Sequence, residues 1–154
     1  MQGPAGQYPT LQVHPGRRCN LQCLHCYSDS GPAVSEQLEI DLLEGVVADA
    51  AAIGYRVMSV SGGEPLLYPG LAQLLRAAHT SGLVTTVTTN GMLLDQRQLN
   101  VLGADCDLVA ISLDGIPESH NFMRNSTRAF DDMCARLPAL RASGIPFGFI
   151  FTLT

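Results

Sequence analysis

Three cysteines lie close together in the short segment GRRCNLQCLHC (16–26). Cys19, Cys23 and Cys26 have the spacing C-x3-C-x2-C. Thiolates grouped in this way can form a disulfide frame, bind zinc, act as a dithiol redox pair or hold an iron–sulfur cluster. The cysteine segment by itself leaves these four kinds of chemistry open.

The composition excludes several classes of protein. The chain has 154 residues, 46% of them apolar and 15% charged, which is enough for one domain with a hydrophobic core. A net charge of −5 and the lack of a long basic run argue against nucleic-acid binding. No signal segment or membrane-spanning apolar run is visible, and the odd total of five cysteines does not fit a secreted disulfide scaffold. We therefore expect a cytoplasmic protein with neither a membrane nor a nucleic-acid partner.

Strand-like and helix-like segments alternate along the chain. Runs rich in Val, Ile, Leu and Thr predict strands at 11–14, 55–60, 83–89, 107–113 and 145–154. Helical spacing of apolar residues predicts helices at 35–54, with Ser35 as the N-cap, and at 70–82, 94–103 and 129–144. This alternation is typical of an α/β fold whose parallel strands are joined by right-handed crossovers.

The expected elements form one domain. Residues 1–10 are expected to be a flexible lead-in, and residues 11–154 contain all the predicted strands and helices. Because the strands are nearly continuous apolar runs, we expect both faces of the sheet to be covered.

A polar segment follows each of the first four predicted strands. The cysteine segment follows the first strand, and the next three are followed by SGGEP (61–65), TNG (89–91) and SLDG (112–115). The carboxyl ends of parallel strands lie at one edge of a sheet, where ligands bind in such folds. Glycine at these turns lets a ligand approach the backbone closely. The four segments are therefore expected to line one site.

The ordered set of these four motifs resembles the radical S-adenosylmethionine (radical SAM) superfamily, over nearly the whole chain. The resemblance implies a partial (β/α) barrel of parallel strands. It also implies truncation relative to the usual six-unit core, with four βα units and a fifth strand present here. The implied cofactors are a 4Fe-4S cluster and S-adenosyl-L-methionine. Three thiolates leave one of the four irons of such a cluster without a protein ligand.

The resemblance also assigns roles to individual residues. It implies that Cys19, Cys23 and Cys26 bind the cluster and that Arg124 pairs with the methionyl carboxylate. The residues implied to contact the remainder of S-adenosylmethionine or the substrate fall into three groups. The amino end is held by Gly62, Gly63, Glu64 and Pro65, the ribose or substrate by Asn90, Ser112 and Asp114, and the adenine by His25.

Other residues are expected to have structural roles. Cys106 and Cys134 are interpreted as small core residues, and His120 as structural. Asn125 stands where many members of the superfamily have glycine.

ISLDG followed by H-x3-R resembles the branch that includes peptide maturases with a SPASM extension. A peptide substrate is therefore the first hypothesis, with a flavodoxin- or ferredoxin-like electron donor. A cofactor-biosynthesis or sulfatase-activating enzyme is the alternative within the superfamily. Outside it, the alternatives are a zinc-binding interaction module, with His14 or His25 as fourth ligand, and a dithiol oxidoreductase that uses CLHC (23–26).

Overall fold

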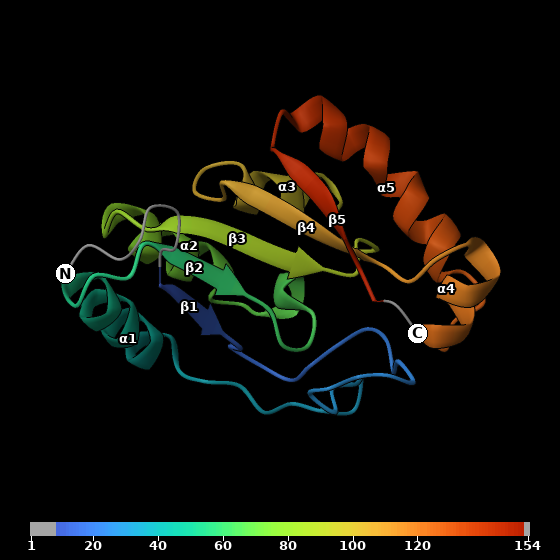
Figure 1. Ribbon diagram of the computed structural model, residues 1–154, viewed down its shortest axis with the longest axis horizontal. Coiled ribbons are helices and arrows are strands. Elements are labelled where there is room, and N and C mark those ends of the chain that lie inside the picture. Colours follow the sequence, from blue (N-terminus) through green and yellow to red (C-terminus); the bar gives the residue numbers. More distant parts are fainter. Residues whose placement is uncertain (1–8, 153–154) are drawn as a thin grey trace.

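The computed structural model describes residues 9–152 and contains a single parallel sheet whose strands follow the order of the sequence (Figure 1). The strands are β1 (Thr10–Val13), β2 (Val57–Val60), β3 (Val84–Thr89), β4 (Leu108–Leu113) and β5 (Phe147–Phe151). Each pairs in parallel with the next. The predicted α/β class is confirmed, as an open sheet. Residues 1–8 of the expected lead-in lie outside the described residues.

Helices connect the strands and pack on one face of the sheet. They are α1 (Ile40–Ala52), α2 (Leu71–Thr80), α3 (Gln96–Leu102), α4 (Pro117–Met123) and α5 (Ala129–Ser143), with a 3-10 turn η1 (Pro65–Leu67) after β2. Contacts join α1 to α2, α2 to α3 and α3 to α5. Right-handed crossovers that always advance in one direction place their helices on the same face. No helix within residues 9–152 combines the length and apolar character needed to cross a membrane.

The two faces of the sheet differ. Val87, Val109 and Ile111 point toward the helices and are fully buried. Their neighbours Thr88 and Ser112 point to the opposite face and are half-buried. The expectation that both faces are covered is therefore wrong for the described part of the chain. This second face mixes polar side chains such as Thr88 and Ser112 with the apolar Val84 and Leu108, which are 50% and 38% exposed.

The first helix begins later than expected. Its N-cap is Glu39 rather than Ser35. The preceding backbone pairs instead with the start of the cysteine segment, because Arg17 N donates to Glu36 O at 3.0 Å and Leu38 N donates to Pro15 O at 2.8 Å. These bonds hold the segment in an extended form, which excludes helix there.

Helix α4 was not predicted. It spans Pro117–Met123, and its seven residues are too few for a clear apolar period. Pro117 at its start, where proline's fixed φ suits the first helical turn, was the available signal. Asn125, just beyond the helix, has φ +50°, a left-handed conformation that asparagine tolerates better than most residues. Asn125 therefore adopts a conformation for which glycine is the usual choice.

Candidate functional site

The cysteine loop, residues 14–39, lies at the carboxyl ends of the strands, the edge toward which the arrowheads in Figure 1 point. Backbone hydrogen bonds attach it on one side to the turn after β2, where Gly63 N donates to Gly16 O and Glu64 N donates to Arg18 O, at 3.0 and 2.8 Å. Gly63 is required for this contact, since a Cβ atom there would overlap the Arg18 carbonyl oxygen. The loop backbone therefore lies directly on the GGEP turn.

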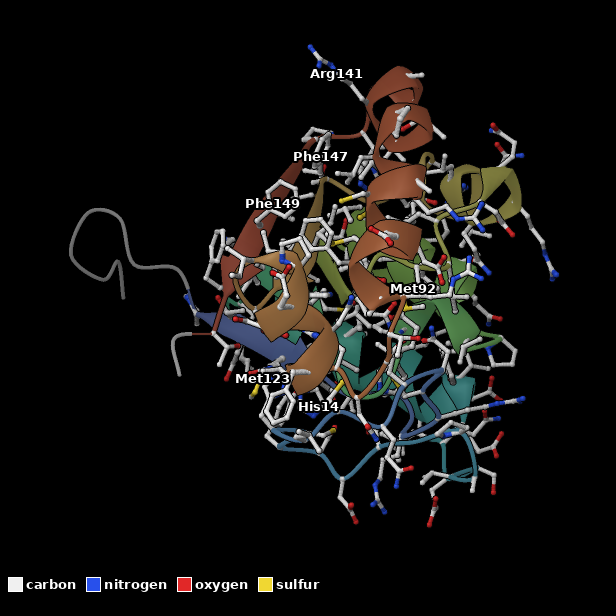
Figure 2. The ribbon with its side chains drawn as sticks, turned by 90° about the vertical axis from the view of Figure 1, so that its right-hand side faces the viewer. His14, Met92, Met123, Arg141, Phe147 and Phe149 are labelled. Carbon is white, nitrogen blue, oxygen red and sulfur yellow. The ribbon has the colours of Figure 1, made fainter. Side chains whose placement is uncertain are left out.

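On its other side the cysteine loop is attached to α4. Leu24 N donates to Met123 O at 2.9 Å. Figure 2 views the molecule from the side of α4 and α5 and shows Met123 at the end of α4 that meets the loop. The unpredicted helix thus supports the segment between the second and third cysteines.

A cavity of about 220 Å³ lies beneath the loop. Ten of the twelve site residues predicted from the sequence line it: Cys19, Cys23, His25, Cys26, Gly62, Gly63, Glu64, Asn90, Ser112 and Arg124. The other two predicted residues, Pro65 and Asp114, are absent from its lining. Segments after all four strands therefore meet around one cavity, as the strand-end argument predicted.

Hydrogen bonds surround the third cysteine. Cys26 Sγ accepts a bond from Ser30 N at 3.4 Å and lies 3.5 Å from Ser28 Oγ. Burial raises the pKa of the Cys26 thiol, but the bonds from Ser28 and Ser30 outweigh it, so the pKa lies below its ordinary value. Ser28 Oγ also lies 3.1 Å from Gly62 O, so its single proton can go to the sulfur or to this carbonyl. Neither serine was identified from the sequence, because only the folded loop brings them to the sulfur.

The other two thiols are more deeply buried. Burial raises the pKa of Cys19 to about 11, against the effect of a bond from Leu21 N. Burial also raises the pKa of Cys23, opposed by Arg124, whose Nη1 donates to Cys23 Sγ at 3.9 Å. Buried thiolates are stable only beside positive charge, and a bound iron–sulfur cluster or metal supplies it. This donor set therefore fits a cationic iron–sulfur core.

The alternatives are less well supported. Within residues 9–152, no three His, Cys, Asp or Glu side chains are placed to hold a single metal ion, as a zinc site requires. The thiolates of an iron–sulfur cubane bind three different irons and need not meet at one point. The CLHC segment does not open a helix, as the dithiol motif of a thioredoxin-like fold does.

Glu64 is buried, and both oxygens of its carboxylate accept hydrogen bonds from within the chain. Oε1 accepts bonds from Thr89 Oγ1 and Leu66 N at 2.8 and 3.1 Å, and Oε2 accepts one from Asn90 N at 3.0 Å. Burial raises the pKa of Glu64, and these three hydrogen bonds oppose the rise. The carboxylate thus links the turn after β2 to the end of β3.

Arg124 extends from the end of α4 to the cavity and is held by Asp114. Its Nε donates to Asp114 Oδ2 at 2.6 Å, and both side chains are nearly buried. The fork of the guanidinium has further donors, and Arg124 lines the cavity. His120 is buried in the same region, where its Nδ1 accepts a bond from Asp114 N at 3.2 Å.

Eight cavity residues were given no individual role by the sequence analysis, although Leu21, Ser61 and Thr89 belong to the segments that it expected at the site. The eight are Leu21, Tyr27, Ser30, Ser61, Thr88, Thr89, Ile150 and Thr152. Thr88 and Ser112 lie on the same, uncovered face of neighbouring strands, which brings both to the cavity. Ile150 belongs to β5 and, with Leu21, adds an apolar side chain to the cavity lining.

The remaining two cysteines lie elsewhere. Cys106 and Cys134 are partly buried against the core and do not line the cavity. Replacing either with alanine is expected to leave the iron content after reconstitution unchanged. The free energy of unfolding should fall by about 1 kcal/mol, as for a small, partly buried side chain. Iron analysis and urea denaturation measure the two effects, and loss of iron on either change would reveal an additional ligand.

The sequence is similar to those of several known proteins. The sequence profile described as "Radical SAM superfamily" matches residues 13–154. The "Fe-coproporphyrin III synthase" of Methanosarcina barkeri is 35% identical over 148 residues, covering 94% of this chain and 37% of that protein. The "GTP 3',8-cyclase" of Chlorobaculum tepidum is 38% identical over 98 residues, covering 62% of this chain and 30% of that protein. The chain thus spans about a third of the length of these relatives.

Solved structures share the fold at lower sequence identity. SuiB of Streptococcus suis, bound to the precursor peptide SuiA, superposes with a TM-score of 0.77 at 20% identity, covering 92% of this chain and 32% of that one. The structure described as anSMEcpe with bound AdoMet gives a TM-score of 0.73 at 22% identity, covering 92% of this chain and 43% of that one. The open five-stranded sheet therefore corresponds to part of the core of larger proteins.

Proposed function

Because this chain belongs to the radical SAM superfamily, we propose that it binds a 4Fe-4S cluster and S-adenosylmethionine in the cavity beneath the cysteine loop. The observation that carries the proposal is that three thiols, the Gly62–Gly63 backbone and the Arg124 guanidinium all line this cavity. When bound, the cluster and S-adenosylmethionine supply a reductive cleavage that yields methionine and a 5′-deoxyadenosyl radical, which abstracts hydrogen from a substrate. The whole protein is proposed to be an enzyme of this kind.

The residues have distinct proposed tasks. Cys19, Cys23 and Cys26 bind three irons and leave the fourth open to the amino and carboxylate groups of the methionyl end. Arg124 offers its remaining guanidinium donors to that carboxylate. The backbone of Gly62 and Gly63 supplies carbonyl acceptors for the ammonium group. Glu64 is proposed to hold the shape of this turn, since its carboxylate is occupied by bonds within the chain.

Three further residues complete the proposed site. Asn90 and Ser112 line the cavity and are proposed to bind the ribose or substrate hydroxyls, while the ring of His25 lies in the lining where the adenine is expected. Asp114 is not in the lining, so we propose an indirect role for it. Pro65 starts η1 and is buried, which suits a role in shaping the turn.

Cleavage of S-adenosylmethionine tests the proposal. The full-length, cluster-loaded and reduced protein is expected to form 5′-deoxyadenosine slowly without substrate, measured by chromatography. Arg124→Lys keeps a positive charge beside Asp114 but loses the fork. It is expected to weaken S-adenosylmethionine binding by about 1.5–3 kcal/mol, the scale of a hydrogen bond to a charged group. The iron content should not change. If S-adenosylmethionine leaves the EPR spectrum of the reduced cluster unperturbed, the proposal is wrong.

For the substrate, two classes have support. The relatives with 35–38% identity are named for a tetrapyrrole product and for GTP cyclisation, which favours a precursor in cofactor biosynthesis. Peptide modification is the second candidate, because the chain shares its fold with SuiB bound to a precursor peptide. At 20% identity, this similarity supports the fold and not the substrate. We propose the cofactor-precursor class. A tetrapyrrole or GTP, rather than a peptide, is then expected to accelerate 5′-deoxyadenosine formation by the full-length protein.

The proposed reaction requires one electron for each cleavage. We propose a flavodoxin- or ferredoxin-like donor and a reducing, cytoplasmic setting, because exposed iron–sulfur chemistry needs protection from oxidation.

A further inference from the structure

The carboxylate of Asp114 lies between the cysteine loop and α4, just behind the cavity. Its side chain is 1% exposed, and Oδ2 accepts the 2.6 Å bond from Arg124 Nε. A buried carboxylate is stable when it is paired and when its other lone pairs also find donors. Asp114 Oδ1, however, has no hydrogen-bond partner among the described residues. One acceptor of a buried charge is therefore left open.

His120 does not fill this role. The backbone N–H of Asp114 donates to His120 Nδ1 at 3.2 Å, so that nitrogen acts as an acceptor and carries no proton. Burial lowers the pKa of His120, and the Arg124 charge lowers it further. In this neutral ring Nδ1 accepts the bond from the Asp114 backbone, so it cannot donate to the Asp114 carboxylate. The nearest carboxylate oxygen recorded for it is Oδ2, at 3.9 Å.

His25 is the side chain that faces the open oxygen. Its Nε2 lies 3.6 Å from Asp114 Oδ1, slightly beyond the usual N–H···O range of about 2.7–3.2 Å. His25 is part of the cysteine loop, between Cys23 and Cys26, and its backbone neighbour Leu24 is bonded to the end of α4. A small inward movement of the loop would complete the bond without moving the sheet.

We propose that Asp114 is a positioning residue that joins the two parts of the cofactor site: Oδ2 holds Arg124, and Oδ1 accepts Nε2–H of His25 once the loop closes on the cluster. This inference rests on the proposed function. A single carboxylate then fixes both the guanidinium and the segment that carries two of the three thiolates. Position 25 therefore requires a side chain that can donate a hydrogen bond from the position of Nε2.

The test compares two replacements of His25 in the full-length, reconstituted protein. His25→Phe keeps the ring and removes the donor, whereas His25→Gln places an amide N–H near the position of Nε2. The measured quantity is the rate at which the cluster loses iron to a chelator, followed by its visible absorbance. We expect loss about tenfold faster in His25→Phe, the scale of one hydrogen bond to a charged group, and a rate within about twofold of wild type in His25→Gln.

Asp114→Ala, which removes the acceptor altogether, completes a double-mutant cycle. It is also expected to speed iron loss, and His25→Phe added to it should have little further effect, because the acceptor of the His25 bond is already gone. A wild-type rate of iron loss in His25→Gln would show that the hydrogen bond, and not the packing of the histidine ring, holds the loop. Equal rates for wild type and His25→Phe, failure of His25→Gln to restore the rate, or additive effects would each overturn the inference while leaving the proposed function intact. A wild-type protein that assembles no cluster would overturn both.

Discussion

Replacing any one of Cys19, Cys23 or Cys26 with alanine is expected to abolish stable cluster binding. The wild-type protein, reconstituted without oxygen, should hold about four irons and four sulfides and absorb broadly near roughly 400 nm. Each thiolate binds a different iron, so the loss of one leaves two irons without a protein ligand instead of one. Iron and sulfide analysis of each variant, with absorbance spectra, measures the effect.

The chain provides controls for this result. Cys106→Ala and Cys134→Ala remove the same thiol group at positions outside the cavity and should retain the iron. S-adenosylmethionine cleavage should disappear together with the cluster in the three loop variants. Stoichiometric zinc without iron in the wild-type protein would show that the loop is a zinc site instead.

Gly63→Ala is expected to have the second largest effect. A methyl group at this position would overlap the carbonyl oxygen of Arg18 and lie 2.8 Å from the carbonyl carbon of Arg17, so no side-chain rotation can relieve the clash. The cysteine loop must move away from the turn after β2, which breaks the bonds from Gly63 and Glu64 to the loop. We expect the free energy of unfolding to fall by about 1–3 kcal/mol or more, as for overpacking, and cluster assembly to fail.

Gly148→Ala is the matched control. Gly148 lies in β5, and an added Cβ atom there meets no atom within 4 Å. Urea denaturation of the two apoproteins and iron content after reconstitution compare them directly. Unchanged iron binding in Gly63→Ala would mean that the close contact between the loop and the GGEP turn is not needed to hold the cluster.

Much of the fold and the site could be predicted from neighbours along the chain. Local apolar patterns predicted the five strands and most of the helices, because each pattern depends only on nearby residues. The alternation of strands with helices then predicted that the strands are parallel, as the sheet shows. The position of each motif directly after a strand predicted that the motifs would meet, because carboxyl ends of parallel strands share one edge. Ten of the twelve predicted site residues line the cavity for this reason.

Predictions failed where a local pattern was short or competed with distant backbone. Helix α4 has only seven residues, and the segment before α1 pairs with the start of the cysteine loop instead of extending the helix. The backbone bonds that hold this segment extended join residues about twenty positions apart in the sequence, and helix propensity depends only on neighbouring residues.

The sequence by itself determined the kind of chemistry: three cysteines at C-x3-C-x2-C, followed in order by GGEP, TNG and SLDG, on an α/β frame. Only the tertiary structure decided which atoms remain free for a ligand. The Glu64 carboxylate is used by bonds to the end of β3, and Asp114 lies behind the cavity wall between Arg124 and His25. The physical reason is that a polar atom is satisfied by whatever donor packs against it, and here those donors come from distant segments. Cys23 and Arg124, which meet at 3.9 Å, are 101 residues apart.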